Sequence, residues 1–196
     1  HDQGVFAVLR QSAGGAWAVD RMDAHPNTFV HEVEIGDLNG DGKLEVYSTP
    51  SEPNRLDGGA QHGEVLRYVP QEGRASRTVV ADLGQRHAKE IWVGDVDGDG
   101  RDELYVAVEA LTRMENGNLI TVEPVEIRRY EHDTPADARV VVATFDDNQC
   151  RFLTVGDFDG DGKREMVAAA MRSGLWLLRP GSNPRGEWSV ERIDGE

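Results

Sequence analysis

The chain has 196 residues, a formal net charge of −15 and 38% hydrophobic residues, and its length allows one domain or two. The negative charge argues against nucleic acids and anionic membranes as partners. No segment approaches the ~20 consecutive apolar residues of a membrane span, so membrane insertion is not expected. The single cysteine, Cys150, excludes a disulfide within the chain and is expected to be a small buried hydrophobe.

The first expected elements are two strands at residues 6–10 and 17–23. They resemble the last two expected strands, residues 175–179 and 188–194. In both pairs an apolar strand ends in Arg, and the next strand begins with Trp. We therefore expect the chain to begin in the middle of a repeating unit.

Three acidic, glycine-rich loops follow at residues 37–45, 95–103 and 157–165, with the same placement of acid and glycine in each. Short apolar, partly β-branched runs flank every loop, and such runs predict strands. The expected strands before the loops are residues 33–36, 91–94 and 153–156, and those after the loops are residues 44–47, 103–106 and 165–168. The period of about 60 residues indicates a repeat architecture.

A second hairpin follows each loop-bearing pair of strands. Its expected strands are residues 65–68 and 78–81, residues 126–130 and 140–143, and residues 177–179 and 188–193. Each period therefore holds four strands, and four-stranded sheets repeated radially are the blades of a β-propeller. We expect an all-β fold of fourteen strands, or three and a half antiparallel blades, in one domain. The expected segments of this domain, residues 1–196, are a half blade at 1–28 and blades at 29–84, 85–147 and 148–196.

Each loop carries the oxygen ligands that a hard cation such as Ca²⁺ prefers. Positions 1, 3 and 5 are Asp or Asn, position 7 can offer its backbone carbonyl, and position 9 is Glu. Glycine at positions 4 and 6 permits the positive φ angles of such a turn. We expect about three Ca²⁺ ions, one per loop. The expected ligands are Asp37, Asn39, Asp41, Lys43 and Glu45; Asp95, Asp97, Asp99, Arg101 and Glu103; and Asp157, Asp159, Asp161, Lys163 and Glu165.

Other interpretations of the loops are weaker. Magnesium prefers to keep several waters, and zinc would require Cys or His, which the loops lack. An EF-hand needs a bidentate Glu at position 12 and flanking helices. A solvated hairpin turn without metal explains one loop better than three matched loops.

These loops and the four-strand period resemble the calcium-binding FG-GAP and VCBS propeller repeats of integrin α heads and bacterial secreted proteins. The Phe-Gly and Gly-Ala-Pro signatures of the integrin version are absent, so the VCBS-like branch is closer. The resemblance implies calcium ions that stiffen each blade. The family includes adhesins, lectin-like proteins and propeller domains of enzymes such as rhamnogalacturonan lyases, so fold alone does not give function.

Three and a half blades leave an open edge, because propellers usually close with four to eight blades. We expect the remainder to come from a longer parent chain, which a first residue other than Met favours, or from a second copy or a partner chain. Calcium modules outside cells are tuned to ~10⁻⁴–10⁻³ M, so an extracellular, cell-surface or periplasmic location is expected.

Basic residues recur six positions before each loop, as His31, Lys89 and Arg151. We expect them, with His87, at the strand ends opposite the calcium loops, on the same strand face as Ile35, where they would bind an anion such as an acidic sugar. Structural pairing with neighbouring acids such as Glu32 and Glu90 is the alternative. Two polar or long connections, residues 49–63 and 111–124, are expected at the same end and often carry binding function.

The sequence leaves three functions open. The first is a calcium-stabilised binding or scaffold module of a secreted or surface protein that recognises a glycan or a protein. The second is the propeller portion of an enzyme acting on acidic polysaccharide, although no catalytic motif is present. The third is a purely structural repeat segment.

Overall fold

The structure is a computed structural model that describes residues 3–194. The outermost residues of the first and last expected segments, 1–2 and 195–196, lie outside the described part. Within it, sixteen strands and one short 3-10 turn, η1 (Gly73–Ser76), make up the regular structure. No helix among residues 3–194 has the length and apolar character needed to cross a membrane.

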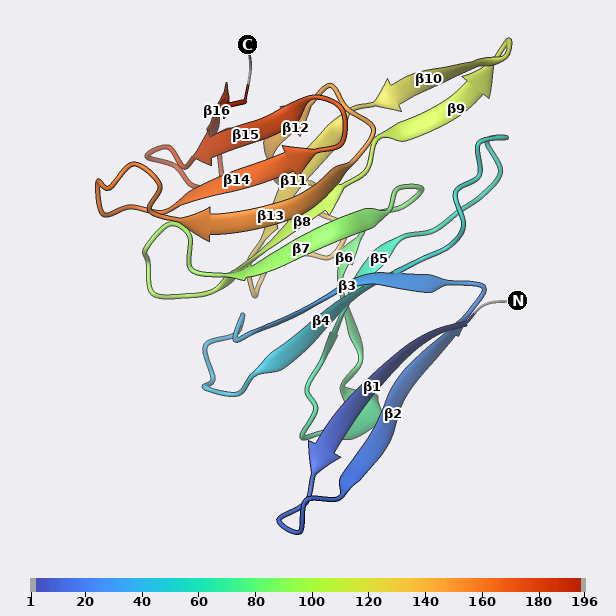
Figure 1. Ribbon diagram of the computed structural model, residues 1–196, viewed down its shortest axis with the longest axis vertical. Coiled ribbons are helices and arrows are strands. Elements are labelled where there is room, and N and C mark those ends of the chain that lie inside the picture. Colours follow the sequence, from blue (N-terminus) through green and yellow to red (C-terminus); the bar gives the residue numbers. More distant parts are fainter. Residues whose placement is uncertain (1–2, 195–196) are drawn as a thin grey trace.

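The strands form three four-stranded and two two-stranded antiparallel sheets (Figure 1). The first four-stranded sheet contains β3 (Phe29–Gly36), β4 (Glu45–Ser51), β5 (Glu64–Tyr68) and β6 (Thr78–Asp82). The second contains β7 (Ala88–Gly94), β8 (Glu103–Val108), β11 (Val125–Tyr130) and β12 (Val141–Phe145). The third contains β13 (Cys150–Gly156), β14 (Glu165–Ala170), β15 (Gly174–Arg179) and β16 (Ser189–Arg192). The two-stranded sheets are the hairpins β1 (Gln3–Gln11) with β2 (Trp17–Pro26) and β9 (Leu111–Glu115) with β10 (Asn118–Glu123).

The all-β expectation is confirmed, and each of the fourteen expected strands overlaps an observed one. The hairpin β9–β10 is the difference, because its residues were expected to form an irregular loop. Its two-residue turn is Asn116-Gly117, with φ of 51° and 81°. Asn-Gly is the preferred sequence for such a turn because both central residues need positive φ.

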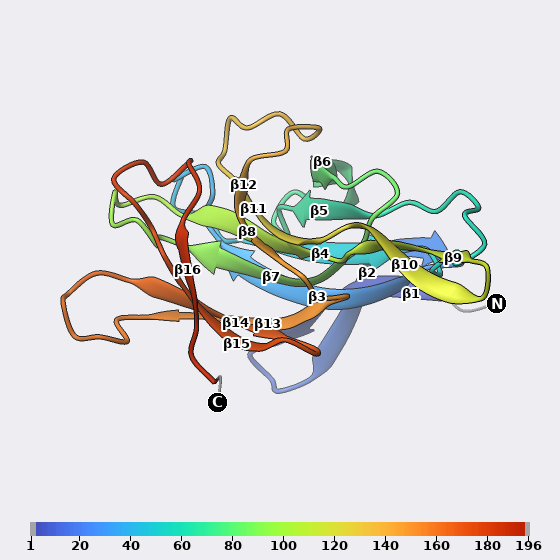
Figure 2. The same ribbon diagram turned by 90° about the horizontal axis from the view of Figure 1, so that it is seen from above.

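The sheets follow one another along the long axis of the molecule, from hairpin β1–β2 to the β13 sheet (Figure 1). Strand β1 contacts β3, β3 contacts β7, and β7 contacts β13. All three acidic loops project from one end of the sheets, on the left of Figures 1 and 2. Hairpin β9–β10 lies at the opposite end, on the right in both views.

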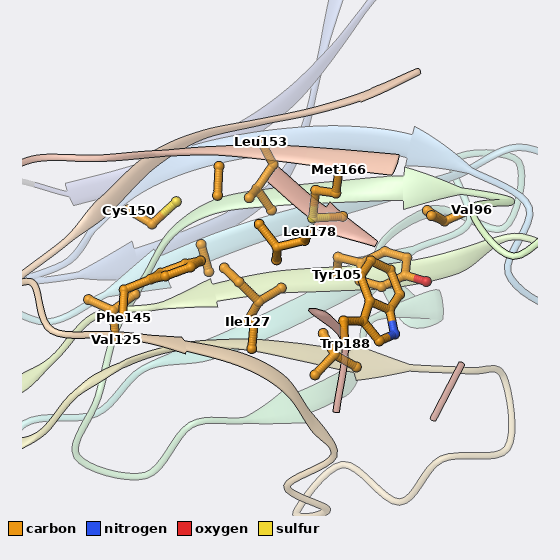
Figure 3. Packing of buried hydrophobic residues seen from close by; sticks show 14 residues of the cluster. Val96, Tyr105, Val125, Ile127, Phe145, Cys150, Leu153, Met166, Leu178 and Trp188 are labelled. Atoms are coloured by element: carbon orange, nitrogen blue, oxygen red, sulfur yellow. The ribbon is translucent and has the colours of Figure 1, made fainter. Parts of the chain in front are cut away.

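An apolar cluster lies between each pair of neighbouring sheets. Phe6 and Tyr68 belong to the cluster between hairpin β1–β2 and the first sheet, and Tyr47 and Ile91 to the one between the first and second sheets. Figure 3 shows the cluster between the second and third sheets. Its labelled members are Val96, Tyr105, Val125, Ile127, Phe145, Cys150, Leu153, Met166, Leu178 and Trp188. The burial expected for Cys150 is confirmed, and burial raises the pKa of its thiol to about 12.

Irregularities in strand pairing recur at equivalent places. The first strand of each four-stranded sheet shifts register near its start, between Val30 and Val33, Ala88 and Glu90, and Cys150 and Phe152. The hairpins β1–β2, β5–β6 and β11–β12 also share a shift, between Phe6 and Ala7, Val65 and Leu66, and Ile127 and Arg128. Bulges redirect side chains, so their repetition supports the equivalence of β1–β2 with the later hairpins.

Gly36, the last residue of β3, allows the first sheet to approach the second. A Cβ at this position would lie 2.2 Å from Val93 Cγ1. We expect Gly36→Ala to lower the free energy of unfolding by about 1–3 kcal/mol, as overpacking does. Urea titration measures this change, and Val93→Ala in the same background should restore part of it.

Gly181→Ala is the matched control, because a Cβ there meets no other atom within 4 Å. Equal stability of the two alanine variants would contradict the close approach of β3 and β7.

Candidate functional sites

The three acidic loops share positive φ angles at the same two positions. The glycines at positions 4 and 6 all have positive φ, between 68° and 88°, as expected. The first Asp of each loop accepts hydrogen bonds from two backbone amides of its own loop, at 2.6–3.1 Å. Each loop joins the first and second strands of a sheet, so helices do not flank it as in an EF-hand.

Carboxylates converge in two of the three loops. Asp95, Asp97, Asp99 and Glu103 each place an oxygen within 4.8 Å of the others, and so do Asp157, Asp159 and Glu165. The acids of loop 37–45 do not form such a group among the described residues. Its third position is an amide, Asn39, which brings one carboxylate fewer.

The Glu at position 9 closes each loop from inside the protein. Its Oε2 accepts a hydrogen bond from the amide at position 2, at 3.3 Å for Glu45, 3.1 Å for Glu103 and 2.8 Å for Glu165. All three side chains are buried. Tyr47 and Tyr105 donate a further hydrogen bond to Glu45 and Glu103. Burial raises the pKa of Glu103 to about 7, because the charged carboxylate loses solvation there.

An arginine from the third strand of each sheet approaches the same acids. Arg129 Nη2 lies 2.7 Å from Asp97 Oδ2 and 3.4 Å from Glu103 Oε1. Arg67 Nη2 lies 2.5 Å from Glu45 Oε1. In the third sheet the partner is more distant and more exposed, with Arg179 Nε at 3.7 Å from Asp159 Oδ2. The loops therefore differ in how much of their negative charge the protein itself offsets.

The side chains at position 7 are exposed, as expected if only the backbone carbonyl is a ligand. Lys43 and Lys163 form ion pairs with the acid two positions earlier, Asp41 and Asp161, at 3.6 and 3.2 Å. Arg101 is also exposed. Whether the three carbonyls bind metal stays a prediction.

Neighbouring loops are joined through the residue at position 8. Asp102 Oδ2 accepts a hydrogen bond from the backbone amide of Asp37, at 2.8 Å. In the next pair of sheets, Arg164 donates to the backbone carbonyl of Asp95. A cavity of about 420 Å³ lies between loops 95–103 and 157–165. The position of one loop thus depends on that of the next.

The basic residues expected at the opposite end come together around Lys89. Its Nζ lies 2.6 Å from His31 Nε2 and 3.4 Å from Glu109 Oε1. Lys89 and Glu109 are almost fully buried, with 8% and 6% of their side-chain surfaces exposed. Arg151 is exposed and donates to Gln149 at 3.2 Å. The anionic partner of Lys89 is thus Glu109, which sequence reasoning missed, and no ion pair among residues 3–194 joins this cluster to Glu32 or Glu90.

His87 extends this cluster toward the β4–β5 connection. Its Nδ1 lies 2.6 Å from Asn54 Oδ1 and 3.8 Å from Glu109 Oε2. Its Nε2 is buried without a hydrogen-bond partner in the described part of the chain. A cavity of about 10 Å³, with room for one water, is lined by Asn54, His87 and Glu109 among others. Asn54 lies in the polar connection 49–63, which was expected at this end, whereas Glu109 belongs to no motif and the sequence offered no signal for it.

The expected placement on one strand face needs correction. Alternation of side chains holds only along an uninterrupted strand, and the register shifts of β3, β7 and β13 fall at His31, Lys89 and Arg151. The bulges therefore redirect these side chains instead of leaving them in line with Ile35.

No family model, no curated protein and no solved structure matches this chain significantly.

Both histidines of the cluster are held neutral. Burial, with the nearby charge of Lys89, lowers the pKa of His31 and of His87 to about 4, from an ordinary value of 6.5. Between these values the unfolded chain binds more protons than the folded protein, so the free energy of unfolding falls as the pH is lowered. This contribution is fully present above pH 6.5.

We expect His87→Asn to reduce the acid sensitivity of the fold. Between pH 7.5 and pH 5, the variant should lose less unfolding free energy than the wild type, by on the order of 2 kcal/mol. Urea titrations at the two pH values measure the difference. Replacing the exposed His132 in the same way is the control, and an identical pH slope for His87→Asn and the wild type would show that His87 is not held neutral.

Proposed function

We propose that the chain is a calcium-stabilised β-propeller segment that serves as a binding or scaffold module of a secreted or surface protein. The observation that carries this proposal is the convergence of Asp95, Asp97, Asp99 and Glu103 within one glycine-turned loop that recurs in the chain. Calcium concentrations outside cells suit modules of this kind, which supports the proposed location.

The residues of the loops fit calcium in kind and in charge. Every candidate ligand atom is an oxygen, which is the ligand type that Ca²⁺ prefers. Structural zinc sites are built from Cys and His instead. In loop 95–103, four carboxylates face one guanidinium, that of Arg129. The negative charge left over is partly buried with Glu103, and a buried charge is costly unless it is paired. A divalent cation would supply the missing positive charge.

Calcium would act here as a structural element. It would hold the second and third loops in the conformation in which Asp102 and Arg164 reach the loops before them. Successive sheets would then be fixed to one another at one end by metal loops and along their length by the apolar clusters. Such a support leaves the opposite end available for recognition of a glycan or a protein.

The propeller arrangement is supported by the repeated sheets. The first strands β3, β7 and β13 lie next to one another in this order, as the innermost strands of neighbouring blades would. Hairpin β1–β2 shares its register shift with the outer hairpins β5–β6 and β11–β12. By this equivalence it is the outer half of a further blade.

Removal of calcium should destabilise the protein. For one site, calcium at 10 times its dissociation constant stabilises the fold by about 1.4 kcal/mol, or a melting-temperature shift of about 3–6 °C for a chain of this size. We therefore expect the melting temperature to fall by at least this amount when EGTA replaces millimolar CaCl₂. Differential scanning calorimetry measures the shift.

Asp97→Asn should remove part of this calcium effect, whereas Asp133→Asn, in an exposed connection, should leave it unchanged. The proposal fails if the wild-type melting temperature is the same in calcium and in EGTA. Restoration by magnesium as effective as by calcium would overturn the assignment of the metal.

The loops should not bind calcium equally. Loop 37–45 has an amide at position 3 and a guanidinium 2.5 Å from Glu45, so we expect it to be the weakest site. Asp41→Asn should therefore change the calcium-dependent melting shift less than Asp99→Asn, the same substitution at position 5 of the second loop. Calorimetric titration with calcium would reveal the order of affinities. A larger reduction of the calcium-dependent melting shift by Asp41→Asn than by Asp99→Asn would contradict this order.

A further inference from the structure

The end opposite the acidic loops gathers donors in a protein that is otherwise acidic. His31, Lys89 and Arg151 lie at the bulges of β3, β7 and β13, one from each four-stranded sheet. Bulges are frequent next to functional sites because they redirect a side chain without ending the strand. Equivalent bulges on three adjacent strands thus bring three nitrogen-bearing side chains to one end of the molecule.

Two of these side chains present donors that the protein does not use. The ammonium of Lys89 can only donate hydrogen bonds, so His31 Nε2 accepts one from it. Because neutral His31 accepts at Nε2, it carries its proton on Nδ1. No hydrogen bond from His31 Nδ1 is found among residues 3–194. Arg151 is exposed, and its one side-chain hydrogen bond in the same part of the chain goes to Gln149. Strand β13, which begins with the bulge at Arg151, contacts β7, which begins with the bulge at Lys89.

Buried polar neighbours hold Lys89 in place. Glu109 lies 3.4 Å from its Nζ and 3.8 Å from His87 Nδ1, and His87 in turn contacts Asn54. Glu109 offsets the charge of Lys89, whereas no ion pair in the described part of the chain offsets that of Arg151. Glu109, His87 and Asn54 are positioning residues, since they act through Lys89.

An aromatic ring lies beside these donors. Phe29 is 38% exposed, its ring meets that of His31 edge-on at 4.4 Å, and Lys89 Nζ lies 5.3 Å from its centroid. Phe152, next to Arg151 in the chain, is 68% exposed. Cationic donors recognise a carboxylate, and an exposed apolar ring recognises the C–H face of a sugar. An acidic peptide would use the donors but would not need the ring.

We propose that His31, Lys89 and Arg151 bind the carboxylate of a sugar acid whose ring packs against Phe29. Arg151 and His31 Nδ1 would donate to the carboxylate, and Lys89 would supply charge from behind. This inference rests on the proposed function, because it names the ligand class of the binding module.

The test is titration of the calcium-saturated protein with galacturonate, its neutral methyl ester and acetate, followed by NMR chemical shifts. We expect galacturonate to bind more tightly than the ester and than acetate. Arg151→Gln should weaken galacturonate and acetate binding about tenfold, a typical loss for one charge-assisted contact. Arg172→Gln, an exposed arginine in the β14–β15 turn at the same end, should leave binding within about twofold of the wild type.

Phe29→Leu separates the ring from the charge. It should weaken galacturonate several-fold and leave acetate unchanged. Equal binding of galacturonate and its ester, absence of binding by the folded calcium-loaded protein, or indifference to Arg151→Gln would overturn the proposal. An acidic peptide that binds more tightly than galacturonate, with the same dependence on Arg151, would reassign the site to protein recognition.

These outcomes are independent of the calcium measurement. A protein that melts at a lower temperature in EGTA but binds no sugar acid keeps the calcium proposal and loses this one. A protein that binds galacturonate without responding to calcium loses the calcium proposal and keeps the carboxylate site.

Discussion

A buried glutamate at the start of the second strand is the constraint on which each sheet depends. Glu45, Glu103 and Glu165 are all buried, and each accepts a hydrogen bond from the second residue of its own loop. This bond closes the loop and fixes where the second strand begins. A carboxylate buried in this way requires positive charge nearby, because removing it from water is otherwise costly. The protein supplies part of that charge through arginines of the third strand.

The first strand of each four-stranded sheet links the two ends of the molecule. Strands β3, β7 and β13 each begin near a bulge that redirects a basic side chain and end at a glycine that leads into an acidic loop. Between these points side chains of β7 and β13 contribute to the apolar clusters that join the sheets. Rigidity at the acidic end is therefore carried directly to the basic end by the strand itself, over a few residues. Such an arrangement suits a scaffold that presents donors at fixed separations.

Local chemistry was predictable from the sequence, and long-range partners were not. The loops, their positive-φ glycines and fourteen strands follow from patterns of adjacent residues. Hairpin β9–β10 also had a local signal, Asn116-Gly117, which a propeller of four strands per period gave no reason to expect. The bulges at His31, Lys89 and Arg151 leave no trace in the alternation of polar and apolar residues. Glu109 meets Lys89 because the start of β7 pairs with the end of β8, Ala88 with Val108, which only the register reveals.

The differences between the three four-stranded sheets matter as much as their similarity. In the first two sheets the position-9 glutamate is offset by an arginine and a tyrosine, Arg67 and Tyr47 in one and Arg129 and Tyr105 in the other. In the third sheet the tyrosine is replaced by Val167, and no described hydrogen bond or ion pair from a basic side chain reaches Glu165.

The third loop is therefore the one whose buried charge the protein compensates least. It is also the loop whose Arg164 contacts the loop before it. A cation bound there would act on two sheets at once, since ordering the third loop also fixes the contact to the second. The third loop, whose buried negative charge the protein compensates least, is thus the loop at which a bound cation would have the largest structural effect.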